Sequence, residues 1–596
     1  SASKLPQLQT EAPASITVID RALIKASGAT QIPELFRLVP GMQVGNARGN
    51  FPVVAYQGLT SEFPQGVQVV IDGSSVYSPI FGGVVWSTLP LALEDIERIE
   101  VVRGPNNASF GANAFQGVIN ITTTHASQAP RLTTSFRTNN NQSERAFFRF
   151  ADTQANKRLN YRISLSSEKK EGYEQFSDDS SKDALSARVD FRLDTKNTLQ
   201  LNFAALDSKR QTQSPIPSLL LFDPKRNRNE STQLAQITWE QQINDGEQVS
   251  TRLSYHHFDG KDKYNVPPFG TLDVGSESTT WDFNAEHIVK FKSAQRLIWG
   301  IGATHESVYA PFRMNSSKTR TNTRVRLFGN LESRLTNQLI FNTGALVEHE
   351  QITGLNVSPR ITLNYLSSPN HAYRITATKA FRTPVIPEEE RDTVLFGTPL
   401  QVSAENIEPE TVTSFEAGYH GIYWLNTLNT DVKLFHNDYK QLINNDLSNT
   451  LPVLDNIDQA KTYGAEIELN YRPNRRNILH AGYAYTQVKH ATDERLNSSI
   501  PKHNFNVLFS HQYDNGFRNG IEYYYTSDMQ YLGGQNDPQG IFQRLDLSAG
   551  KLIKLGNNKS IDINLNLQLA LNKNTDFHEP TTADNLIYLE MKYLAH

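Results

Sequence analysis

The residues best suited to chemistry in this 596-residue chain are histidines that stand beside one another or beside carboxylates. They are His256-His257 and Glu348-His349-Glu350. Imidazole and carboxylate groups are the usual ligands of divalent metals. Both segments are expected to be strands, in which successive side chains point to opposite faces, so neither can gather its groups easily around one ion. We therefore expect no metal site and no bound cofactor.

Catalytic signatures are absent from the sequence. The chain has no Cys, which excludes disulfides, thiolate metal sites and thiol nucleophiles, and its 4 Met argue against a Met-lined copper site. No phosphate-binding GxxxxGK[ST] loop is present, and no Ser/His/Asp order or paired-carboxylate pattern stands out. The sequence predicts a protein that is not an enzyme.

Composition excludes further classes of protein. A net charge of −4 argues against a nucleic-acid-binding protein, which would carry a basic face. With 38% apolar residues, including 30 Phe and 23 Tyr, the chain can bury a large core. Mean hydropathy is −0.49 and no run of 18 apolar residues occurs, so no transmembrane helix is expected. A membrane β-barrel has the same average, because only alternate residues face lipid.

Residues 1–125 have the pattern of a small, glycine-rich mixed α/β unit. A short helix is expected after Thr30, which can cap it, and Pro40-Gly41 should end it. Strands are expected at 67–71, 96–102 and 118–122.

Residues 126–596 follow a different pattern, in which short segments alternate between apolar and polar side chains. In 561–571 every odd residue is Ile or Leu, while 463–472 set Glu466 and Glu468 opposite Ile467 and Leu469. A membrane barrel with a wet lumen and a soluble sandwich both produce this alternation. At roughly 20 residues per strand, the region predicts about 22 antiparallel strands, which is the class of barrel whose lumen is plugged.

Several motifs, in a fixed order along nearly the whole chain, resemble those of TonB-dependent outer-membrane transporters. In the first unit they are EAPASITVIDRALIKAS at 11–27 and EDIERIEVVRGPNNASFGANAFQGVINITTT at 94–124. In the rest of the chain they are VSPRITLNY at 357–365, AFRTP at 380–384, NIEPETVTSFEAGY at 406–419, YGAEIELNY at 463–471 and IPKHNFNV at 500–507.

The resemblance implies a plug domain (1–125) inside a 22-stranded transmembrane β-barrel (126–596) in the outer membrane of a Gram-negative bacterium. It also implies import of a scarce nutrient, energised by TonB with ExbB–ExbD and the proton-motive force. A ferric siderophore is the leading ligand; cobalamin, haem, another metal chelate and a carbohydrate are the alternatives within the family. The stretch from Phe381 to Asn406 lacks the His that haem receptors commonly carry there. We expect a monomer that contacts lipopolysaccharide and outer-membrane lipid. A passive porin and a soluble β-protein are the alternatives of another class.

By the same resemblance, plug arginines meet two glutamates of the barrel wall. The matching residues are Arg103 in the plug and Glu416 and Glu466 in the wall. A second plug arginine of the family is replaced by Gln57, so one glutamate is expected to find another cation or to bond to Gln57. Charged pairs that lose their water hold position while adding little net stability, which suits a plug that must later yield.

Ligand contacts are expected on plug loops that match the family's outward loops. The candidates are Arg48, Phe63, Tyr77, Phe81 and Trp86, and packing of these aromatic residues against the wall is the competing interpretation. Residues 1–10 contain no evident TonB box, the short strand by which the family docks to TonB. We expect that box upstream of residue 1, with a different mode of coupling as the alternative.

Overall fold

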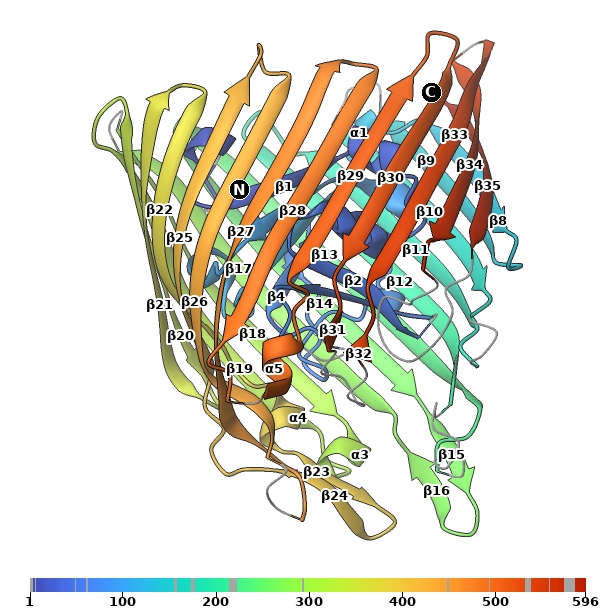
Figure 1. The fold of residues 1–596 in the computed structure, drawn as a ribbon, viewed down its shortest axis with the longest axis vertical. Helices are drawn as coiled ribbons and strands as arrows, with labels where there is room; N and C mark the ends of the chain where they lie inside the picture. Colours follow the sequence, from blue (N-terminus) through green and yellow to red (C-terminus); the bar gives the residue numbers. More distant parts are fainter. Residues whose placement is uncertain are drawn as a thin grey trace.

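The computed structural model describes residues 4–5, 7–48, 50–59, 63–154, 158–172, 177–213, 222–291, 294–446, 450–492, 494–530, 538–556, 558–572 and 585–596. Residues 132–595 form a closed, antiparallel barrel of 22 long strands that surrounds the N-terminal unit (Figure 1). Among the described residues, no helix has the length and apolar character needed to span a membrane.

The first barrel strands are β8 (Leu132–Asn139), β9 (Glu144–Thr153), β10 (Leu159–Lys170), β11 (Ser180–Arg192), β12 (Asn197–Thr212), β13 (Arg226–Asn244), β14 (Glu247–Lys261), β17 (Ser276–Phe291), β18 (Gln295–Tyr309), β19 (Arg320–Arg334) and β20 (Leu339–Glu350). The others are β21 (Gly354–Ser368), β22 (His371–Arg382), β25 (Glu410–Tyr423), β26 (Leu428–Asp446), β27 (Val453–Asn474), β28 (Asn477–Lys489), β29 (His503–Gln512), β30 (Phe517–Thr526), β33 (Phe542–Gly556), β34 (Lys559–Ala570) and β35 (Leu586–Ala595). Strand β35 pairs with β8 and closes the barrel.

The alternation predicted from the sequence sets the two faces of the wall. In β34, Ile563 and Leu565 are exposed on the outside, whereas Asp562 and Gln568 are buried toward the lumen. In β27, Ile467 and Leu469 lie outside and Glu466 is fully buried inside. An apolar outer face around a polar interior is the arrangement of a membrane barrel, so the soluble-sandwich alternative is wrong.

The two rims differ in the length of their connections. One rim carries short turns such as 245–246, 369–370 and 475–476. The other carries long connections with short elements of their own (Figure 1): β15 (Lys263–Val266), β16 (Gly270–Asp273), α3 (Pro311–Met314), α4 (Ile386–Glu389), β23 (Asp392–Leu395), β24 (Thr398–Ser403), α5 (Glu494–Ser498), β31 (Met529–Gln530) and β32 (Pro538–Gln539). In membrane barrels the long loops are extracellular, which assigns the rim of short turns to the periplasm.

The plug is built on a five-stranded sheet in the order β1-β6-β7-β4-β5. These strands are β1 (Ser15–Asp20), β4 (Val67–Ile71), β5 (Ser74–Ser75), β6 (Ile96–Arg103) and β7 (Gly117–Thr123), and a separate hairpin pairs β2 (Met42–Arg48) with β3 (Phe51–Tyr56). The helical segments are η1 (Gln9–Glu11), α1 (Arg21–Ser27), η2 (Ile32–Leu38), η3 (Trp86–Thr88), η4 (Leu93–Asp95), α2 (Asn107–Phe110) and η5 (Ala126–Gln128). The predicted boundary between residues 125 and 126 falls at η5, and we keep it as a proposal.

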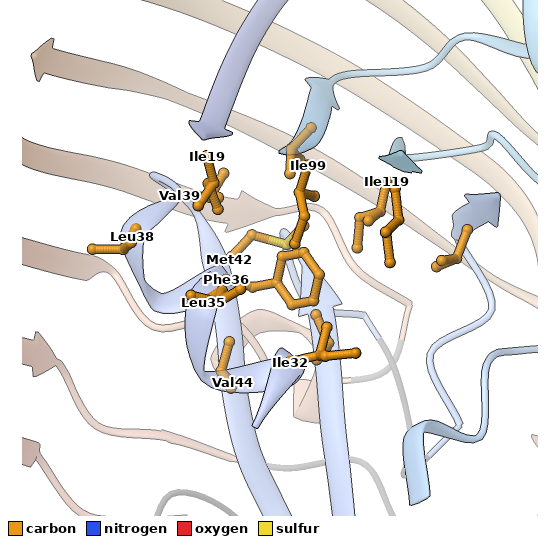
Figure 2. Close-up of a cluster of buried hydrophobic side chains, with 14 of the residues drawn as sticks. Ile19, Ile32, Leu35, Phe36, Leu38, Val39, Met42, Val44, Ile99 and Ile119 are labelled. Carbon is orange, nitrogen blue, oxygen red and sulfur yellow. The ribbon is translucent and has the colours of Figure 1, made fainter. Parts of the chain in front are cut away.

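The core of the plug lies between η2 and the sheet. Leu35 and Phe36 of η2 pack with Ile19, Ile99 and Ile119, all of which are less than 1% exposed (Figure 2). The strands expected at 67–71, 96–102 and 118–122 are present as β4, β6 and β7. The short helix expected after Thr30 is a 3-10 helix, and its N-cap is Gln31 and not Thr30. The Thr30 hydroxyl donates to Glu34 Oε2 at 3.2 Å, and its backbone N–H donates to the same oxygen at 2.7 Å.

Candidate functional site

Arg103 at the end of β6 is the fully buried cation through which the plug contacts the wall. Its Nη1 lies 3.0 Å from Glu466 Oε2, and its Nη2 lies 2.7 Å from Asp431 Oδ1 and 3.3 Å from Glu468 Oε2. The Arg103 and Glu466 side chains are both 0% exposed. The pairing of Arg103 with Glu466 that the resemblance implies is present.

The predicted pairing of Arg103 with Glu416 is replaced by one within the wall. Lys433 of β26 places its Nζ 3.2 Å from Glu416 Oε1, and it also donates to the Tyr56 hydroxyl at 2.9 Å and to the Arg103 carbonyl at 3.2 Å. Glu416 still contacts the plug closely, because a Cβ added to Gly104 would lie 2.3 Å from Glu416 Oε1. We call Arg103, Glu416, Asp431, Lys433, Glu466 and Glu468 the Arg103 cluster.

Gln57 occupies the place of the missing second arginine. Its Nε2 donates to Glu466 Oε1 at 3.2 Å, and its Oε1 accepts from Asn437 Nδ2 at 3.0 Å. The neighbouring Tyr56 hydroxyl donates to the same Glu466 oxygen at 2.6 Å. Neutral donors and Lys433 therefore take over from the second arginine, as the sequence-based expectation for Gln57 allowed.

The electrostatics of the cluster keep Arg103 charged. Burial alone would lower the pKa of its guanidinium, but Asp431 and Glu466 more than offset this and hold the pKa above its ordinary value. Burial and the Glu466 carboxylate raise the pKa of the Tyr56 hydroxyl, which therefore stays a donor. The arrangement is a desolvated, hydrogen-bonded charge network, so removal of one member leaves others buried without a partner.

Sequence reasoning missed Asp431 and Lys433. Both lie on β26, where Asp431, Lys433, Phe435 and Asn437 alternate with outward residues such as Leu434. Asp431 and Lys433 are 5% and 1% exposed. Two opposite charges two residues apart on one strand face were the available signal.

A second ionic contact between plug and wall has the opposite polarity. Asp95 of η4 is 0% exposed, and its Oδ1 lies 3.4 Å from Arg149 Nη1 and 3.6 Å from Arg162 Nε, on β9 and β10. Next to it, Glu94 forms a bidentate pair with Arg145 at 2.6 and 2.8 Å. In this Asp95 cluster (Glu94, Asp95, Arg145, Arg149 and Arg162) the plug supplies the carboxylates and the wall supplies the cations.

The plug loops that face the extracellular rim carry an aromatic group. Phe63 and Phe81 stack with ring centroids 4.5 Å apart, Phe51 meets Phe63 edge-on at 5.3 Å, and the Arg313 guanidinium lies 5.1 Å from the Phe81 centroid. Phe81 is buried at 8% exposure, whereas Phe63 is partly exposed. Stacked rings beside a guanidinium suit a ligand with flat or anionic groups.

The other three candidates are placed differently. Trp86 is buried in the plug core against Phe36, with centroids 5.2 Å apart, which favours packing for this residue. Tyr77 is 6% exposed, and its hydroxyl donates to the Gln65 carbonyl at 3.3 Å. Arg48 ends β2, but its side chain lies outside the described part of the structure. Ligand contact by these residues stays a prediction.

The segments His256-His257 and Glu348-His349-Glu350 are both in strands, so successive side chains point to opposite faces, as predicted. Glu348 and Glu350 are each 1% exposed toward the lumen, while His349 between them is on the outer face. Over the described ranges, no group of three or more histidine or carboxylate side chains has the geometry to hold a metal ion.

Comparison with known proteins agrees with this architecture. A family model described as "TonB-dependent Receptor Plug Domain" matches residues 9–118, and one described as "TonB dependent receptor-like, beta-barrel" matches residues 103–572. The iron-regulated outer membrane virulence protein of Vibrio cholerae serotype O1 is 23% identical over 91% of this chain and 85% of its own length. The vitamin B12 transporter BtuB of Vibrio vulnificus is 33% identical, over only 21% of this chain and 20% of its own length.

Solved structures share the fold over the whole chain. A mutant of the ferric enterobactin receptor PfeA of Pseudomonas aeruginosa superimposes with a TM-score of 0.80 at 15% identity, covering 98% of both chains. The siderophore receptor PirA of Acinetobacter baumannii gives 0.80 at 14% identity, covering 97% of this chain and 98% of its own. With a plug held inside a 22-stranded barrel and family models that together span residues 9–572, this chain belongs to the TonB-dependent receptors of the outer membrane.

Proposed function

We propose that this receptor imports a ferric siderophore, with energy that TonB and ExbB–ExbD deliver from the proton-motive force. The observation that carries the proposal is the likeness to an iron-regulated outer-membrane protein across 91% of the chain. The ferric enterobactin and PirA receptors have the same fold and are named for siderophores, which supports the same ligand class. The cobalamin alternative rests on a match over about a fifth of the chain.

The mechanism follows from the geometry. The plug fills a lumen that would otherwise leak, and the Arg103 and Asp95 clusters hold it to two parts of the wall. Each cluster is desolvated, so it fixes the position of the plug without adding much net stability. The stacked Phe63 and Phe81 rings beside Arg313 provide an outer surface where an aromatic, anionic chelate would bind. In this proposal the plug loosens when TonB pulls on it, and catalysis plays no part.

The partners beyond TonB are also proposals. We propose that the chain works as a monomer, because its barrel closes on itself through β35 and β8 and leaves no strand edge open there. The exposed apolar outer face is proposed to contact membrane lipid, and the extracellular rim to contact lipopolysaccharide.

Uptake by a deletion strain tests the ligand. The strain, with and without this chain on a plasmid, is given iron-55 on a panel of catecholate, hydroxamate and carboxylate siderophores and, separately, cobalt-57 cobalamin. We expect plasmid-dependent uptake of iron from one chelate class, abolished in a tonB background. Plasmid-dependent uptake of cobalamin without any iron chelate would overturn the siderophore proposal.

A further inference from the structure

Two carboxylates of the wall face each other across adjacent strands, away from the Arg103 and Asp95 clusters. Glu522 of β30 is directly opposite Asp546 of β33, and the two side chains are only 3% and 9% exposed. On its other side Glu522 is opposite Leu508 of β29, which is apolar and fully buried. Directly opposite side chains have their Cβ atoms only about 4.5–5.5 Å apart, and like charges placed so destabilise a sheet. The pair therefore needs a positive charge.

The protein satisfies only part of this need. Asp546 Oδ2 accepts from Arg544 Nη2 at 2.6 Å, but Asp546 Oδ1 and both oxygens of Glu522 have no hydrogen bond of normal geometry from the described residues. The Tyr524 hydroxyl faces Glu522 from the same strand, and it is a neutral group. Asn506 of β29, opposite Tyr524, is 0% exposed, and neither polar atom of its amide has a partner among the described residues. A buried carboxylate left in this state is costly.

The two guanidinium groups beside the pair are engaged with the plug and with aromatic rings. Arg544 Nη1 lies 4.0 Å from Oε1 of Glu34 in η2. Arg37 of η2 lies over the rings of Tyr524 and Phe542, with its guanidinium carbon 5.7 and 4.9 Å from their centroids. Burial alone would raise the pKa of Glu34, but Arg544 more than offsets this and holds the pKa below its ordinary value. Arg544 thus serves Asp546 of the wall and a charged Glu34 of the plug at once.

The charges of this group do not balance. Three carboxylates meet two guanidinium groups, so the group is one positive charge short. Lys170 of β10 also acts on Glu34, but Glu168 is the stronger influence on this lysine. The deficit is at Glu522, to which no described cation forms an ion pair.

We propose that Glu522 and Asp546 bind one small monovalent cation, a proton or Na⁺, and that this cation seats η2 of the plug against the wall. Two carboxylates this close can share one proton, and their free oxygens are ligands of the kind that Na⁺ accepts. A divalent ion would overshoot the missing charge, and Ca²⁺ takes six to eight oxygen ligands. Without the cation, Glu522 competes with Glu34 for Arg544, and η2 loses its ion pair to the wall. The inference does not depend on the transported ligand.

Unfolding temperatures of two variants test the missing charge. In sodium-free choline buffer at alkaline pH, where the site is empty, Glu522→Gln should unfold at the same temperature as the wild type or higher, because the amide removes an uncompensated charge. The matched control is Glu230→Gln. Glu230 is also 3% exposed in the lumen, but it lies 2.8 Å from both Arg210 and Arg228, so its loss should lower the unfolding temperature. An equal loss in both variants would overturn the proposal.

Two measurements at neutral pH identify the occupant. If it is a proton, the infrared difference spectrum between wild type and Glu522→Gln should show the carbonyl stretch of a protonated carboxylic acid in the wild type. If it is Na⁺, that band is missing, and the unfolding temperature of the wild type should be higher in sodium chloride than in choline chloride of equal concentration. Glu522→Gln should show no such difference between the two salts. Absence of both the band and the sodium effect would overturn the cation site.

Hydrogen exchange tests the seating of the plug. Exchange of the η2 amides, corrected for the intrinsic chemical rate, should become about tenfold faster for each tenfold fall in cation concentration down to the dissociation constant. In Glu522→Gln the corrected rates should not depend on the cation. Equal corrected rates in the wild type with the site filled and empty would overturn the role of the cation in seating η2.

Discussion

Asp95, directly before plug strand β6, and Arg103, its last residue, bind wall segments of opposite charge. Asp95, just before β6, contacts arginines of β9 and β10, and Arg103, at its end, contacts carboxylates of β26 and β27. Seven barrel strands separate the two wall segments by the shorter way round. Strand β6 is therefore fastened across the lumen at both ends.

Arg103→Ala should loosen the plug while the barrel remains intact. The change takes the guanidinium away from Glu466 and Asp431, which keep only Lys433, at 3.9 Å, and Arg374, at 2.9 Å, as cations. Breaking a buried ion pair by removing one partner typically costs about 3–5 kcal/mol. We expect faster hydrogen exchange in β6 and β7, slower transport and unchanged heat-modifiable migration of the barrel. Arg98→Ala, in the same strand but with an exposed side chain paired to Glu100, is the control and should behave as wild type. Unchanged exchange and a normal transport rate in Arg103→Ala would contradict the prediction.

Asp95→Asn should release the other end of β6. The variant keeps the shape of the side chain but leaves Arg149 and Arg162 without a carboxylate. We expect a higher basal conductance in planar bilayers and greater sensitivity of cells to a bulky antibiotic that the outer membrane excludes. Glu97→Gln is the matched control, because its pair with Arg21 is partly exposed. If both variants conduct alike, Asp95 is not a fastening point.

Gly104→Ala and Gly111→Ala separate backbone strain from a clash with the wall. Both glycines have positive φ, +118° and +90°, so either alanine should cost about 1–3 kcal/mol in strain. Only at Gly104 does the added Cβ meet Glu416, whereas nothing lies within 4 Å at Gly111. We expect larger plug loosening, measured by limited proteolysis, for Gly104→Ala. Equal susceptibility of the two variants would show that Glu416 does not press on the plug.

The pKa of Glu94 predicts that the stability of the fold depends on pH. Burial alone would raise its pKa, but Arg145 more than offsets this and holds the pKa below its ordinary value. A carboxyl with a depressed folded-state pKa stabilises the fold above its unfolded pKa of about 4.3, and this stabilisation is lost as pH falls through the folded pKa. The melting temperature of wild type should exceed that of Glu94→Gln by a constant amount from pH 6 to 8. The difference should shrink only below about pH 4; a difference that vanishes near pH 6 would disprove the assignment.

Phe63→Ala tests the aromatic surface. Loss of a ring that stacks on Phe81 and is partly exposed should weaken ligand binding at least tenfold with the plug still in place. Trp424→Ala removes an exposed aromatic at the periplasmic rim and is the control. Affinity is measured by binding of the radiolabelled chelate to whole cells, and an unchanged affinity would place the ligand elsewhere.

The barrel could be predicted from the sequence because alternation is a local property. Each strand, such as Lys559–Ala570, shows in its own residues which face meets lipid, and the length of the region sets the number of strands. Three plug strands, β4, β6 and β7, were similarly visible, whereas the short helix after Thr30 was predicted with the wrong cap. Thr30 is a good cap in isolation, but in the structure its hydroxyl donates to the Glu34 carboxylate and the N-cap is Gln31.

The candidate site could be predicted only in part. Arg103, Glu466 and the bond of Gln57 to Glu466 followed from motif positions, whereas Asp431, Lys433 and the Asp95 cluster depend on which strands lie opposite the plug. The strands that lie opposite the plug are determined by the register of the whole barrel and by the rotation of the plug within it. A short sequence motif contains information on neither. Trp86 was expected either to contact ligand or to pack, and its place in the plug core favours packing for this residue.

The opposite polarity of the two ends of β6 also bears on assembly of the molecule. Turning the plug half a revolution would take Asp95 away from Arg149 and Arg162, and Arg103 away from Glu466 and Asp431, and buried charges that lose their partners are costly. The wall can therefore close around its occupant in one orientation only. Exchanging the signs at both ends of the strand, without changing the wall, would produce a receptor that matures slowly or is degraded before it reaches the cell surface.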